Sequence, residues 1–238
     1  MAKRSEGGSP TGEPERECAA TSQGFGTVQP MTRMLLARHG QSEWNALGRW
    51  QGQADPPLSE LGRRQARAAA ERLGTVDAIV SSDLERALTT AAIVAEALGV
   101  GPVLVEPRLR ERSAGEWSGL TRDEIEAGWP GYLAGHLRPP GFESDASLLA
   151  RTTAALADLA AEHADAELLV VTHGGVVYVI EADAGLPFAR LPNLSGRWLA
   201  HRGDRIDLGD RVELVDEHVD APAVSEAVRV ADDEAGRV

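Results

Sequence analysis

Short apolar runs alternate with longer helix-like segments along the middle of this chain, and that alternation limits its possible folds most. The run at residues 168–172 is continuously apolar, as expected for a parallel strand that is buried on both faces. Similar runs predict strands at residues 34–37, 78–81 and 102–105. Two later, more polar strands are expected at residues 197–201 and 205–215, with Gly203 and Gly209 as turns.

Capping residues and helix stops delimit the segments between these strands. Ser59 is expected to cap a helix that runs to about Leu73, and Ser82 or Asp83 a second helix that stops before Gly99. Further helices are expected at residues 147–163 and 175–184, and a short one after the capping-box pair Thr121 and Glu124. This order predicts a three-layer α/β/α sandwich with a mostly parallel central sheet.

The two ends of the chain lack the apolar periodicity of the middle. Residues 1–30 are rich in Gly, Ser and Pro, which predicts a disordered N-terminal extension. Residues 216–238 are interpreted as an acidic C-terminal tail, and residues 31–215 as one domain. Met31 precedes the first strand, so translation from Met1 and from Met31 both remain open.

The composition narrows the classes of partner. A net charge of −13 argues against nucleic acid or an anionic membrane, but it leaves room for a small anionic substrate beside a local arginine cluster. No stretch approaches the roughly 18 apolar residues of a membrane span. Cys18 is the only cysteine, which excludes an intrachain disulfide and fits the cytoplasm. We expect a monomer or a homodimer.

Side chains of catalytic type follow each of the first four predicted strands. Arg38 and His39 follow the first, Arg86 lies in the helix after the second, Glu111 follows the third and His173 follows the fourth. Ligands of open parallel sheets bind beyond the carboxyl ends of the strands. We therefore expect these five side chains to surround one pocket at that edge.

Each of these residues also has a purely structural interpretation. His39 could be a hydrogen-bonded structural histidine, and Arg86 could form a surface salt bridge with Asp83. Glu111 lies in a charge-rich run of the kind that usually faces solvent. The two glycines after His173 indicate either a tight strand-to-helix turn or a close approach of the backbone to a ligand.

Taken together, the five residues predict phosphoryl transfer. Arg38 and Arg86 can each give bidentate hydrogen bonds to phosphoryl oxygens, and His173 can donate to the equatorial oxygens. A neutral His39 imidazole can attack in line, and Glu111 can protonate the leaving alkoxide. The chain has no zinc-type ligand pattern and no G-x-x-x-x-G-K-[ST] loop, so neither a metal nor a cofactor is expected.

Five blocks of the sequence stand out in order: residues 36–45 (LARHGQSEWN), 55–62 (DPPLSELG), 81–87 (SSDLERA), 109–119 (LRERSAGEWSG) and 171–175 (VTHGG). Together they resemble the histidine phosphatase superfamily, in its phosphoglycerate-mutase-like branch. The resemblance implies the three-layer fold, His39 as phosphoryl acceptor, Arg38, Arg86 and His173 as phosphate ligands, and Glu111 as proton donor. It also implies substrate contacts for Asn45, Gln51, Gly52 and Gly174.

Two departures from the mutase pattern favour the phosphatase members of that family. Gln41 stands where the mutases carry Glu, and Gly175 stands where they carry Asn. Residues 124–147, where the mutases place a basic cluster, hold one arginine, Arg138, and no lysine. We therefore predict a phosphatase of small phosphorylated metabolites. The alternatives are a phosphoglycerate mutase using the same histidine and, less favoured, a non-catalytic module that binds a phosphorylated ligand.

Substrate specificity is expected to come from the segment between Glu111 and His173. Four of its side chains could line the pocket, although each could equally belong to the core or the surface. They are Tyr132, His136, Arg138 and Phe142.

Overall fold

The computed structural model describes residues 30–203 and 205–216. The expected extension, apart from Pro30, and the expected tail, apart from Asp216, lie outside the described residues. The part that is described folds around one six-stranded sheet with the strand order β3-β2-β4-β1-β5-β6.

Four strands of this sheet are parallel and two form an antiparallel edge. The central pair β1 (Met31–Arg38) and β4 (Glu167–Thr172) run parallel, and β2 (Ala78–Ser81) and β3 (Leu104–Val105) continue in the same direction. β5 (Ser195–Arg202) pairs antiparallel with β1, and β6 (Arg205–Glu213) pairs antiparallel with β5. The predicted mostly parallel sheet is confirmed.

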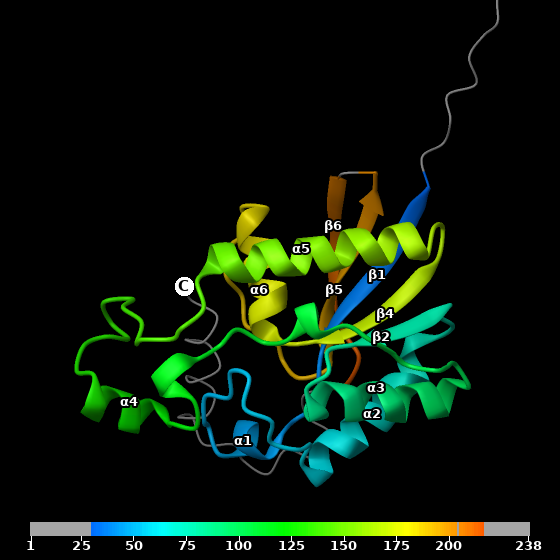
Figure 1. The fold of residues 1–238 in the computed structure, drawn as a ribbon. Helices are drawn as coiled ribbons and strands as arrows, with labels where there is room; N and C mark the ends of the chain where they lie inside the picture. Colours follow the sequence, from blue (N-terminus) through cyan, green and yellow to red (C-terminus); the bar gives the residue numbers. More distant parts are fainter. Residues whose placement is uncertain (1–29, 204, 217–238) are drawn as a thin grey trace, which may run out of the picture.

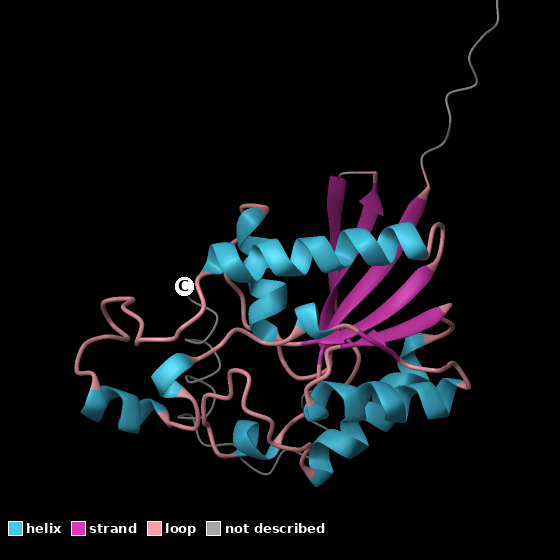
Figure 2. Ribbon diagram, viewed as in Figure 1, coloured by secondary structure: helices cyan, strands magenta, loops and turns pink. Residues whose placement is uncertain are grey.

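Helices cover both faces of the sheet, as Figures 1 and 2 show. The helices α2 (Glu60–Leu73) and α3 (Glu85–Leu98) lie on one side, and α5 (Asp145–Glu162) and α6 (Gly174–Asp183) lie on the other. Shorter elements occupy the connections: α1 (Glu43–Ala46), η1 (Pro107–Leu109), η2 (Gly115–Trp117) and α4 (Arg122–Gly128). The three-layer α/β/α arrangement predicted from the sequence is confirmed.

The side-chain alternation of the strands divides the core into two halves. Met34 and Leu36 of β1 pack with α5 and α6, whereas Leu35 and Ala37 pack with α2 and α3. Successive side chains of a strand point to opposite faces, so a strand in the middle of the sandwich must be apolar throughout. This explains the unbroken apolar runs from which the fold was predicted.

A third, smaller core lies away from the sheet. It consists of Trp50, Trp117, Ile125 and Leu133, with Phe142 packed against it. Trp117 is fully buried, and its ring meets that of Trp50 edge to face at 5.3 Å between centroids. Figure 1 shows α4, which carries Ile125, projecting beyond the sandwich, so this core stabilises the loops beyond the carboxyl ends of the strands.

The strand and turn predictions needed two corrections. Gly209 is not a turn: it lies inside β6, where a Cβ atom would approach the Cβ of Trp198 to 3.1 Å at a register shift between β5 and β6. Gly203, with φ of 59°, does lie in the turn. The third strand is shorter than expected, since β3 contains only Leu104 and Val105.

The predicted cap of α3 was also wrong. The N-cap residue is Leu84, whose side chain has no acceptor and so makes no cap, and Ser82 and Asp83 have other partners. The Asp83 carboxylate pairs with the Arg110 guanidinium, and the Ser82 hydroxyl bonds to His173. The α5 helix begins two residues earlier than expected, capped by Ser144, and α6 is shifted by one residue to Gly174–Asp183.

Among the described residues, none of the helices is both long enough and apolar enough to cross a bilayer.

Candidate active site

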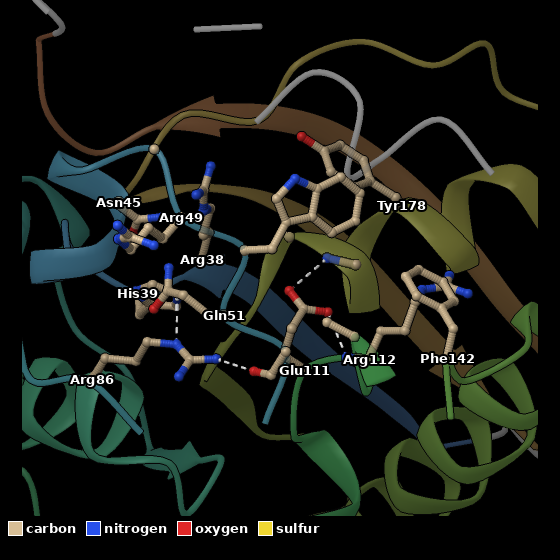
Figure 3. Close-up of a pocket in the computed structure, with 16 residues that line it drawn as sticks. Arg38, His39, Asn45, Arg49, Gln51, Arg86, Glu111, Arg112, Phe142 and Tyr178 are labelled. Atoms are coloured by element: carbon tan, nitrogen blue, oxygen red, sulfur yellow. Dashed lines mark hydrogen bonds between the residues drawn. The ribbon is translucent and has the colours of Figure 1, made fainter. Parts of the chain in front are cut away.

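One hollow of about 730 Å³, continuous with solvent, opens beyond the carboxyl ends of the parallel strands. Figure 3 shows the labelled side chains around it, which come from β1, from α1 and the loop after it, from α3 and α6, and from the segment between β3 and α5. All but one of the predicted site residues line it: Arg38, His39, Asn45, Gln51, Gly52, Arg86, Glu111 and Gly174. The exception, His173, lies beside it, with its ring centroid 5.1 Å from that of His39.

The hydrogen bonds of His39 assign its tautomer. Nδ1 lies 2.7 Å from the Gly40 carbonyl oxygen, which can only accept, and Nε2 lies 3.2 Å from Nε of Arg86, which can only donate. Nδ1 therefore carries the proton and Nε2 carries the free electron pair. Burial lowers the pKa of His39 well below its ordinary value, and the charges of Arg86 and Arg38 lower it further. The ring is a neutral imidazole whose basic nitrogen, Nε2, faces Nε of Arg86.

His173 is fully buried at the N-cap position of α6. Its Nε2 lies 2.9 Å from the Ser82 hydroxyl, and its Nδ1 has no hydrogen-bond partner among the described residues. Burial lowers the pKa of His173 well below its usual value, and the nearby Arg86 adds to that effect. An unpaired buried ring nitrogen this close to His39 is suited to a ligand oxygen.

Two buried arginines supply positive charge at the base of the pocket. Arg86, fully buried in the first turn of α3, donates Nη1 to the Ala54 carbonyl at 2.7 Å and Nη2 to the Gly52 carbonyl at 2.8 Å. Arg86 therefore does not pair with Asp83, the alternative that the sequence left open. Burial lowers the Arg86 pKa to about 10, so it remains charged at neutral pH.

Arg38 ends β1, and its Nη1 donates to the Leu191 carbonyl oxygen at 2.8 Å. That loop also holds Asn193, whose Nδ2 donates to the His39 carbonyl oxygen at 2.9 Å. This loop could not be predicted from the sequence, because a backbone carbonyl contributed by a distant segment leaves no residue pattern.

Glu111 is oriented by two backbone amides. Its Oε1 accepts from the Arg112 amide at 2.6 Å and its Oε2 from the Gly175 amide at 3.1 Å. A Cβ atom on Gly175 would lie 2.2 Å from Oε1, so only glycine leaves room for the carboxylate in this position. That clash gives a physical reason for the Gly175 departure noted in the sequence.

Asn45 and Gly52 lie where local backbone geometry requires them. Asn45 completes a capping box of α1, since its Oδ1 accepts from the Ser42 amide at 3.2 Å. Gly52 has φ of 52° and approaches Ala114 so closely that a Cβ atom would lie 2.6 Å from the Ala114 nitrogen. Gln51 accepts from the Ser42 hydroxyl at 2.8 Å, which links the two loops.

The outer part of the pocket contains residues that were not among the predicted site residues. Arg49 lines it and pairs with Glu124, with Nη1 at 2.9 Å from Oε2. Arg112 lines it as well, forms an ion pair with Asp145 and lies under the Phe142 ring. Trp50 and Tyr178 add aromatic walls. The position of Arg49, two residues before the predicted substrate contact Gln51, was the sequence signal that could have identified it.

Of the four side chains proposed for specificity, the structure brings one to the pocket, Phe142. Tyr132 packs against the small core of Trp50 and Trp117, and His136 is exposed with φ of 54°. The Arg138 guanidinium lies over the Phe142 ring, 5.2 Å from its centroid. The described residues contain no group of three or more His, Cys, Asp or Glu side chains that could hold a metal ion.

Comparisons with known proteins agree with this geometry. The family model described as "Histidine phosphatase superfamily (branch 1)" matches residues 34–202. The glucosyl-3-phosphoglycerate phosphatase of Mycobacterium tuberculosis is 41% identical over 180 residues, which cover 69% of this chain and 80% of that protein. A probable phosphoglycerate mutase of Enterobacter sp. is 34% identical over 221 residues, which cover 84% of this chain and 100% of that protein.

A solved structure of mycobacterial glucosyl-3-phosphoglycerate phosphatase in complex with VO3 has the same fold. It superposes with a TM-score of 0.66 at 38% identity, over 76% of this chain and 97% of the other.

Proposed function

The chain belongs to the histidine phosphatase superfamily and hydrolyses phosphomonoesters, and from that premise we propose that His39 is its nucleophile and Glu111 its proton donor. The observation that carries the proposal is the tautomer of His39. A neutral ring with its proton on Nδ1 presents the Nε2 electron pair to the phosphorus atom of a bound ester.

The first step transfers the phosphoryl group to His39. Nε2 attacks phosphorus while the bond from phosphorus to the ester oxygen breaks, and Glu111 donates its proton to the departing oxygen. Each Glu111 oxygen accepts one backbone amide and keeps a second electron pair, so either oxygen can carry that proton. Arg38, Arg86 and Nδ1 of His173 bind the phosphoryl oxygens as negative charge develops on them.

The second step returns the enzyme to its starting state. Water attacks the phosphohistidine, the bond from Nε2 to phosphorus breaks, and the Glu111 carboxylate takes the proton released by the water. The products are an alcohol and inorganic phosphate. By microscopic reversibility the group that protonates the leaving oxygen is also placed to activate the incoming water.

The charges around the outer pocket support hydrolysis over mutase activity. A mutase must retain a doubly phosphorylated ligand, which calls for cations beyond the phosphate-binding pair. Arg49 and Arg112 occupy that region, but each already forms an ion pair with a carboxylate, Glu124 or Asp145. Their charge is thus partly offset, and Arg138 lies over aromatic rings.

One assay separates the two activities. The protein is given 3-phosphoglycerate with catalytic 2,3-bisphosphoglycerate, and separately p-nitrophenyl phosphate and a panel of phosphorylated metabolites. We expect release of inorganic phosphate from at least one ester. Rapid formation of 2-phosphoglycerate, with little phosphate from any ester, would instead identify a mutase, and ligand binding without turnover would identify a non-catalytic module.

A cytoplasmic monomer or homodimer completes the proposal. A single cysteine in 238 residues fits a reducing compartment. Cell fractionation and light scattering of the purified protein test the two parts.

A further inference from the structure

One arginine outside the pocket holds the backbone that carries Glu111. Arg151, in α5, donates Nη1 to the carbonyl oxygens of Arg108 and Arg110, both at 2.6 Å. Its Nη2 donates to the carbonyl oxygen of Glu111 itself at 3.0 Å. Three carbonyls within four consecutive residues therefore converge on one guanidinium.

The other edge of this guanidinium binds Glu143. Nε of Arg151 lies 2.9 Å from Oε1 of Glu143, and Nη2 lies 2.9 Å from Oε2. This is a bidentate ion pair between two largely buried side chains. The Glu143 backbone also bonds to the chain just after Glu111, since its amide donates to the Ser113 carbonyl at 3.0 Å. All five donors of the Arg151 side chain are thereby used.

Other side chains also bond to this segment: the Thr172 hydroxyl donates to the Leu109 carbonyl at 2.8 Å and Gln53 Nε2 donates to the Glu111 carbonyl at 3.1 Å. Each of these bonds holds one carbonyl, whereas Arg151 holds three.

Glu111 lies between η1 and η2, outside any helix or strand. Among the described residues, its side chain accepts hydrogen bonds at the tip alone, from the amides of Arg112 and Gly175. A displacement of reacting groups by about 1 Å can cost roughly 100-fold in rate, so a loose segment would impair a proton donor carried on it.

We propose that Arg151, held by Glu143, is a positioning residue that fixes residues 108–111 so that Glu111 meets the leaving oxygen. Neither side chain is among the described residues that line the pocket, so both act through Glu111 and do not touch the substrate. The inference rests on the proton-donor role proposed above for Glu111.

The test compares two aryl phosphates of similar shape, p-nitrophenyl phosphate and phenyl phosphate. The first has a good leaving group that scarcely needs protonation, and the second has a poor one. The variants are Arg151→Met, Arg151→Lys and Glu111→Gln, with the combination of Arg151→Met and Glu111→Gln. Arg108→Gln is the matched control: Arg108 lies on the same segment, but its side chain pairs with Glu106 and with Asp158 of α5 and not with Glu111.

We expect Arg151→Met to lower kcat/KM for phenyl phosphate by about 100-fold and for p-nitrophenyl phosphate by less than about tenfold. Arg151→Lys keeps the charge but not the planar fork, so it should show the same selectivity in weaker form. Adding Arg151→Met to Glu111→Gln should cause almost no further loss on phenyl phosphate, because the group being positioned is already disabled. Arg108→Gln should remain within about twofold of wild type on both substrates.

Equal losses on the two substrates, or independent losses that multiply in the double variant, would overturn the positioning role. If Arg151→Met melts below the assay temperature, Arg151→Lys and Glu143→Gln are compared by the same substrate ratio below their own melting temperatures. An unchanged ratio in both would also overturn it. Failure of the proposed function would give a different result: wild type would hydrolyse neither ester, or Glu111→Gln would itself lower kcat/KM equally for both esters.

Discussion

Arg86 donates its Nε–H to Nε2 of His39 over 3.2 Å, in the same ring whose Nδ1–H is given to the Gly40 carbonyl. The nitrogen proposed to attack phosphorus is therefore already paired with a cation proposed to bind the phosphate. A bound phosphoryl group can take that Arg86 donor for one of its own oxygens and release the Nε2 electron pair. Substrate binding would in this way both offset the charge of Arg86 and free Nε2 of His39 for attack.

The first prediction concerns His39. His39→Ala should lower kcat by about 10⁴-fold or more on every ester, because the covalent route is lost. Rapid mixing of wild type with p-nitrophenyl phosphate, followed by alkaline denaturation, should trap phosphohistidine, and the variant should trap none. The control is His136→Ala, which alters an exposed histidine and should behave as wild type. A fully active His39→Ala protein would refute the covalent route.

The second prediction concerns Glu111. Glu111→Gln keeps the shape of the side chain but cannot supply a proton, so kcat/KM should fall by about 10²-fold or more for alkyl phosphates. The loss on p-nitrophenyl phosphate should be much smaller. Steady-state kinetics on both substrates checks this, and similar losses on the two would count against the proton-donor role.

The third prediction concerns pH and stability. Burial first, and then the Arg86 charge, lowers the pKa of His39 and of His173 in the folded protein. Below about pH 6.5 the unfolded chain therefore binds protons that the folded chain does not, and the free energy of unfolding falls as pH falls. Above that pH the contribution of these two groups is constant.

Chemical denaturation between about pH 5 and about pH 8 measures this slope. Combining His39→Asn with His173→Asn should flatten it, whereas His136→Asn, at an exposed position, should leave it unchanged. Sulfate, which can occupy the arginine pocket, should also reduce the slope by making protonation of these rings less unfavourable. A slope that persists in the double variant would show that other groups cause it.

The fourth prediction concerns Gly175. In Gly175→Ala the new methyl group would lie 2.2 Å from Oε1 of Glu111, so the carboxylate must move. We expect kcat/KM for phenyl phosphate to fall more than about tenfold, with a smaller fall for p-nitrophenyl phosphate. Gly128→Ala is the matched control, since a Cβ atom there has no heavy atom within 4 Å among the described residues. Wild-type kinetics in Gly175→Ala would mean that the position of the carboxylate is not critical.

The fifth prediction concerns the N-terminal segment. A protein that starts at Met31, and so lacks residues 1–30, should keep its melting temperature and its activity, because those residues carry no apolar pattern to bury. Thermal melts and p-nitrophenyl phosphate hydrolysis test this. A large fall in either would show that the segment contributes to the folded domain.

The sequence alone determined the class of fold and the main chemistry. Strands that are buried on both faces must be apolar throughout, so β1 and β4 were visible as short runs, and the helices between them followed from caps and periodicity. Parallel strands bring their carboxyl ends to one edge, which is why His39, Glu111 and Arg86 could be expected to surround one pocket before any coordinates.

Only the tertiary structure decided the orientation and protonation of these site side chains. The tautomer of His39 depends on Gly40 and Arg86, the orientation of Glu111 depends on the Gly175 amide, and Ser82 serves His173 and caps no helix. Arg49, Tyr178 and the Leu191 carbonyl come to the pocket from segments with no motif. Hydrogen bonds and close contacts need positions correct to a fraction of an ångström, and distant segments acquire such positions only when the layers pack together.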